Sequence, residues 1–214
     1  MASALALAAC SSSDSNGGGS ASFPAAPDRP DPGNLESVSE VQQTAQATLN
    51  DLGGEQPYNG ELVTLLESIR DASPDTPTDT ALAGEASYSG SLAAVTAADD
   101  ASVLGDLSMN VNFDSGSLDG DLTSVRTLGD NNTILETNGT ASIDGSVTGN
   151  SLEADIDGQF SGGGESVTVA GKMDGEFRDT NADEVVGATS LNLTSSEGGG
   201  VETFDGGFHA TQDQ

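Results

Sequence analysis

Residues 167–177 read VTVAGKMDGEF, and every second position is apolar or glycine. Val167, Val169, Gly171, Met173, Gly175 and Phe177 form this series. The residues between them are Thr168, Ala170, Lys172, Asp174 and Glu176. Strict alternation of this kind is typical of a β-strand with one buried face. We therefore predict a strand here, with its apolar face toward a core.

Seven further runs show the same period of two and are separated by glycine-, asparagine- and aspartate-rich turn signals. They are residues 86–92, 107–113, 118–122, 141–147, 152–160, 185–193 and 204–210. No helical pattern lies between them. The sequence therefore predicts an all-β fold, an eight-stranded antiparallel up-and-down β-barrel. Glycines mixed with Phe, Met and Leu on the apolar face suit a small, filled interior.

The charge indicates which face of each strand points outward. The chain has 35 Asp and Glu against 5 Lys and Arg, a formal net charge of −30, which argues against a nucleic-acid partner. Residues 84–211 hold 22 acidic residues and three basic ones, Arg126, Lys172 and Arg178. An eight-stranded lumen cannot hold so many unpaired carboxylates, since each desolvated charge costs several kcal/mol. We therefore predict a soluble barrel with its polar face outside.

The first ten residues predict a lipid anchor. Residues 7–10, Leu-Ala-Ala-Cys, match a bacterial lipobox, in which Cys10 receives acyl chains that hold a protein at a membrane. Residues 1–10 are then a lipoprotein signal peptide, and the Gly-, Ser- and Pro-rich residues 11–34 are a disordered tether. We expect a bacterial outer-membrane location with surface exposure.

A period of three to four residues in 35–72 predicts a helical segment, with Asn34 and Asn59 as helix caps. Two interpretations stay open for it. It is either a helical hairpin packed on its own domain, which we favour, or an arm that binds a partner. Residues 73–83 are a linker, and residues 84–211 are the barrel domain.

Residues 175–187 resemble a hairpin motif, G-x-F-Y-G-P-x-A-x-E-x-G-G, of the transferrin-binding protein B β-barrel family. Its surface lipoproteins include factor H-binding-type relatives. The matching positions are Gly175, Phe177, Ala182, Glu184 and Gly187, and Phe208 matches the last strand of the family more loosely. The Gly-Pro pair of the motif is Asp179-Thr180 here. The resemblance implies the barrel fold and a surface lipoprotein. It implies a structural role for the motif, and it does not imply transferrin as ligand.

Other candidate sites are weak. Asp179, Asn181 and Asp183 have the spacing of the start of a calcium loop, but the glycine and glutamate that such a loop needs later are missing. We therefore expect a polar turn and no metal. His209 lies on the polar face, where we expect a solvated side chain. We expect no cofactor and no enzymatic activity.

The function that these observations favour is a lipid-anchored surface lipoprotein. We expect a monomer that is attached to the membrane through its lipid and that binds a protein or an iron-related ligand. The alternative is a lipocalin-like carrier of a small apolar molecule, which would need an internal cavity. A hydrolase that uses His209 is a remote third possibility.

Overall fold

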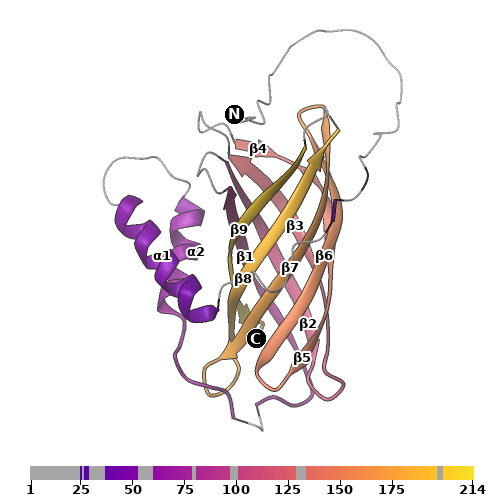
Figure 1. Cartoon of the computed structure of the whole chain (residues 1–214). Helices are drawn as coiled ribbons and strands as arrows, with labels where there is room; N and C mark the ends of the chain where they lie inside the picture. Colours follow the sequence, from indigo (N-terminus) through magenta and orange to yellow (C-terminus); the bar gives the residue numbers. More distant parts are fainter. Residues whose placement is uncertain are drawn as a thin grey trace.

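A computed structural model of the chain describes Ala25, Pro27, Asp28 and residues 37–52, 60–78, 81–96, 101–128, 134–196 and 200–214. Eight antiparallel strands close into a barrel, in which each strand pairs with its neighbours along the chain and β9 pairs with β1 (Figure 1). The predicted up-and-down barrel is thereby confirmed. Its strands are β1 (Glu85–Thr96), β2 (Ser102–Asn112), β3 (Ser117–Leu128), β5 (Asn138–Thr148), β6 (Ser151–Gly162), β7 (Glu165–Arg178), β8 (Glu184–Ser195) and β9 (Val201–Gln212).

One short strand was not predicted. β4 (Ile134–Glu136) pairs with the end of β3 at Arg126–Leu128, and β5 then continues along the rest of β3. Between them the backbone N–H and the hydroxyl of Thr137 both donate to the carbonyl oxygen of Val125. Three residues are too few to show a period, so the alternation could not reveal β4.

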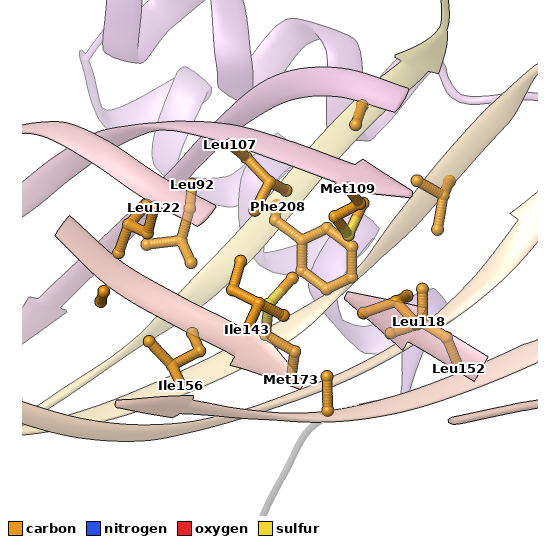
Figure 2. Packing of buried hydrophobic residues seen from close by; sticks show 14 of the residues in the cluster. Leu92, Leu107, Met109, Leu118, Leu122, Ile143, Leu152, Ile156, Met173 and Phe208 are labelled. Carbon is orange, nitrogen blue, oxygen red and sulfur yellow. The ribbon is translucent and has the colours of Figure 1, made fainter. Parts of the chain in front are cut away.

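The alternating apolar side chains fill the barrel interior (Figure 2). Phe208 lies in the middle of the cluster, between Met109 and Met173, and all three side chains are at most 1% exposed. The same interior cluster also contains Leu92, Leu122, Ile143 and Ile156. The predicted inward face of the strands is confirmed.

The helical segment forms two helices, α1 (Val38–Leu52) and α2 (Gly60–Asp71). The residue that caps α1 is Ser37, and Asn34 lies outside the described residues. The Ser37 backbone N–H donates to the Glu40 carboxylate at 2.9 Å, and the Glu40 N–H donates back to the Ser37 hydroxyl at 3.4 Å. This reciprocal pair is a capping box, which satisfies two backbone donors at the helix start. Asn59 also lies outside the described residues.

The two helices pack as a hairpin against the outside of the barrel, over β1, β8 and β9 (Figure 1). The favoured interpretation of the helical segment is therefore confirmed. The hairpin covers an outer platform that we define as Ala93, Leu104, Val186, Ala188 and Gly207. A side chain at Gly207 would place its Cβ 2.8 Å from Val41 Cγ1 and 3.2 Å from Ile69 Cδ1. Glycine at this position allows the helices to approach the sheet closely.

The segment that follows α2 runs along one end of the barrel. The backbone N–H of Thr78 donates to the Thr180 carbonyl at 3.2 Å, and the N–H of Asp179 donates to the Asp75 carbonyl at 3.0 Å. Ala81 and Leu82 then pack against the interior cluster. These contacts join the predicted linker to the β7–β8 turn. Within the described part of the chain, no helix has both the length and the apolar composition needed to cross a membrane.

Candidate functional site

Two residues of the family-like motif close one end of the barrel. Phe177 is fully buried, with its ring centroid 5.4 Å from that of Tyr88 and 5.0 Å from that of Phe113. The Tyr88 hydroxyl donates to the buried carbonyl of Ala182 at 2.7 Å, which ties the β7–β8 turn to β1. Burial raises the pKa of Tyr88 well above its usual value, so this hydroxyl keeps its proton. Sequence reasoning placed Tyr88 on the inner face but did not find this bond.

The motif glycines make room for Phe208. Gly175 and Gly187 are cross-strand partners, and Gly187 also pairs with Phe208. A Cβ at Gly175 would lie 2.7 Å from Phe208 Cζ, and a Cβ at Gly187 would lie 2.7 Å from Phe208 Cε1. These three residues therefore form one packing unit inside the barrel.

Glu184 has a different role, on the outside of the barrel. Its Oε2 accepts a hydrogen bond from the Ser73 backbone N–H at 3.0 Å and lies 3.9 Å from His209 Nε2. The His209 side chain is only 14% exposed, so the prediction of a solvated histidine was wrong. The chain that leaves α2 lies beside this end of β8, where Ser73 contacts Glu184. Burial lowers the pKa of His209, and the nearby Glu184 opposes that shift only in part.

The calcium-like spacing forms a polar turn. The Thr180 hydroxyl donates to Asp179 Oδ1 at 3.0 Å, and the Asn181 amide donates to Asp183 Oδ2 at 3.4 Å. The side chains of this turn therefore bond to one another. Among the described residues, no group of three or more His, Cys, Asp or Glu converges as a metal site would require. The geometry gives no support for a cation here.

A second arrangement is an acidic face on the outside of β3, β5, β6 and β7. Asp119, Asp144, Asp155 and Lys172 are successive cross-strand partners in one row. Asp155 forms an ion pair with Lys172, whereas Asp119 and Asp144 face each other as like charges. The acidic face is defined by eight carboxylates: Asp119, Asp121, Asp144, Glu153, Asp155, Asp157, Asp174 and Glu176.

The acidic face is hollowed between β5, β6 and β7. A shallow groove of about 260 Å³ lies there, lined by residues that include Asp144, Glu153, Lys172 and Asp174. Burial raises the pKa of Asp174, and the like charges of Glu153 and Glu176 raise it further. Because the helices pack over β1, β8 and β9, this face is on a different part of the barrel wall (Figure 1). The arrangement produces a negative potential that attracts cationic groups.

The hairpin is also fixed by one ion-pair cluster that sequence reasoning missed. Arg126 on β3 places Nη1 2.8 Å from Glu61 on α2 and Nη2 3.3 Å from Asp106 on β2. No local pattern links these three residues, because their meeting depends on where the hairpin docks. Cys10 and most of the tether lie outside the described residues, although the Asp28 carbonyl accepts a hydrogen bond from the Asn192 amide at 2.7 Å.

No protein-family model matches the chain, and no curated protein matches it either.

Proposed function

We propose that the chain is a lipid-anchored bacterial surface lipoprotein whose barrel is a non-enzymatic binding module. The lipobox ending at Cys10 and the long Gly- and Ser-rich tether support the anchor. The conformation of Asp179 supports the resemblance to the transferrin-binding protein B-like family. Its φ of 68° favours glycine, which the family motif has at this position.

The acidic face carries the proposal for partner binding. It spans four adjacent strands and lies away from the helical hairpin. Its eight carboxylates outnumber the two basic side chains that pair with them, Lys172 with Asp155 and Arg178 with Glu176. A protein surface rich in Lys and Arg would be complementary to it, and that complementarity would speed association. We propose a basic protein surface as the partner, with the loops at the barrel ends adding specificity.

A carrier with its ligand inside the barrel is the weaker alternative. The axis is occupied by Phe208, Met109 and Met173, which are packed and almost fully buried (Figure 2). A ligand of drug size needs a cavity of roughly 300–1,000 Å³. Several of these side chains would have to leave the interior to provide it.

Affinity capture with paired variants tests the partner surface. The first variant carries Asp119→Asn, Asp121→Asn and Asp144→Asn, all exposed positions on the acidic face. The matched control carries Glu67→Gln, Glu136→Gln and Asp213→Asn, which are exposed elsewhere and remove the same charge. We expect the first variant to lose a partner that the wild type and the control both retain. Equal loss in both variants would mean that net charge, and not this face, attracts the partner.

The anchor is tested separately. Replacing Cys10 with alanine should abolish metabolic lipid labelling and release the protein from membranes in soluble form. Protease treatment of whole cells should digest the wild-type barrel if it is exposed at the surface. Membrane retention of the Cys10→Ala protein at the wild-type level would contradict the anchor while leaving the binding surface untouched.

A further inference from the structure

A groove lies between the helical hairpin and the barrel wall. It is bounded by α1 and α2 on one side and by β1, β8 and β9 on the other. Its volume is about 350 Å³, which is within the range of small-molecule sites. The groove is outside the barrel, so it is distinct from the filled interior and from the acidic face.

Three small residues of the platform, Ala93, Ala188 and Gly207, line this groove together with both helices. Ala93, Ala188 and Gly207 form one cross-strand row on the outer surface, and none of them reaches far toward the helices. The helices contribute five apolar residues and two threonines: Val41, Ala45, Leu62, Leu66, Ile69, Thr44 and Thr48. The helices contact the platform at Gly207, where a Cβ would lie 2.8 Å from Val41 Cγ1, so the groove lies beside this contact. An apolar chain lying there would bury hydrocarbon against both walls.

The mouth of the groove combines an exposed apolar side chain with a carboxylate. Val95 is 37% exposed and lines the groove. Its cross-strand partner Asp205 also lines the groove and is exposed. Among the described residues that line the groove, none is Lys, Arg or His. A ligand with a cationic end would therefore meet an opposite charge at the mouth, whereas an anionic end would be repelled by Asp205 and by the net charge of −30.

We propose that this groove binds a single-chain aliphatic molecule with a cationic head group, a long-chain alkylammonium compound. The hydrocarbon chain lies in the groove beside the Gly207 contact, and the ammonium group pairs with Asp205 at the mouth. This site is independent of the proposed partner surface, because it shares no residue with the acidic face.

Isothermal titration calorimetry tests the site. Dodecylamine is added to the full chain at concentrations below its critical micelle concentration. We expect one saturable site, with dodecylamine bound about tenfold or more tightly than dodecanoate. Butylamine, which has the same charge and a short chain, should not saturate. Equal binding of butylamine and dodecylamine, or no saturable binding of dodecylamine, would overturn the proposal.

Two variants localise the binding. Val95→Gln removes an apolar wall at an exposed position, so it should fold, and we expect it to weaken dodecylamine about tenfold. Asp205→Asn should weaken dodecylamine while leaving dodecanol unchanged. Val201→Gln is the matched control, because Val201 is also an exposed valine, 56% exposed, and lies outside the groove. If Val95→Gln and Val201→Gln bind dodecylamine equally, the groove is not the site.

Discussion

Replacing Gly207 with valine should detach the helical hairpin from the barrel. Gly207 faces outward in β9, where a Cβ would already lie 2.8 Å from Val41 Cγ1 and 3.2 Å from Ile69 Cδ1. The two methyl groups of valine extend further toward α1 and α2. Inserting such groups into a packed interface costs about 1–3 kcal/mol. Valine by itself favours a strand over glycine by up to about 1 kcal/mol, so the local preference and the packing have opposite signs here.

We expect packing to prevail in the equilibrium between docked and detached hairpin. A strain of about 1–3 kcal/mol corresponds to roughly 5- to 150-fold more detached hairpin. The released helices, of 15 and 12 residues, are near the length at which isolated helices are marginal in water. Detachment should therefore melt them while the closed barrel stays folded.

Trypsin provides a direct assay, because Arg70 is the only Lys or Arg between residues 37 and 83. Cleavage after Arg70 should accelerate in Gly207→Val, and hydrogen exchange should increase in α1 and α2 but not in β6 and β7. Gly200→Val is the control, since a Cβ at Gly200 meets nothing within 4 Å. If Gly207→Val keeps the wild-type cleavage rate and thermal stability, the close approach of the helices to β9 does not hold the hairpin.

Three other variants test the remaining packing and charges. Tyr88→Phe should lower the free energy of unfolding by about 1–3 kcal/mol in urea titrations, because the buried Ala182 carbonyl loses its donor; an unchanged value would contradict the bond. Asp144→Asn should raise stability by about 0.2–1 kcal/mol for each like-charge neighbour it relieves, measured at low salt. His209→Gln tests the lowered pKa of His209. The wild-type contribution is complete above the ordinary pKa of about 6.5 and is lost as the pH falls through the lower folded value. Wild type should therefore lose more stability than the variant between about pH 8 and about pH 5, and parallel pH profiles would refute this.

The barrel could be predicted from sequence because its information is local. In β7 each inward residue from Val167 to Phe177 is two positions from the next, and closure follows once eight such strands have one apolar face. The capping box of α1 was also readable, since Ser37 and Glu40 have the S-x-x-E spacing. Asn34 was predicted as the cap because the helix start was placed from the apolar pattern alone.

The alternation does not reveal where the hairpin docks on the barrel. That place is marked by exceptions to the alternation. Val186 and Ala188 occupy outward positions in β8 where polar residues are expected, and both are buried beneath the helices. Ala93 is a similar exception in β1. Such outward apolar positions are a usable signal that a barrel wall is covered. The burial of His209 and the ion pair of Arg126 with Glu61 follow only after docking, so they have no signal of their own.

The acidic face bears on the origin of the negative charge. If the excess negative charge served only to keep the surface hydrated in salty surroundings, the carboxylates would not need to lie opposite one another. Like charges directly opposite each other cost about 0.2–1 kcal/mol per pair. Asp119, Asp144 and Asp155 nevertheless lie in one cross-strand row, and salt at about 0.15 M screens exposed charges only beyond roughly 8 Å. Neighbours in such a row therefore repel each other even in salt. Stability that is gained by Asp144→Asn while partner capture is lost would indicate that the repulsion is retained for binding. Stability gained with capture unchanged would favour the hydration explanation.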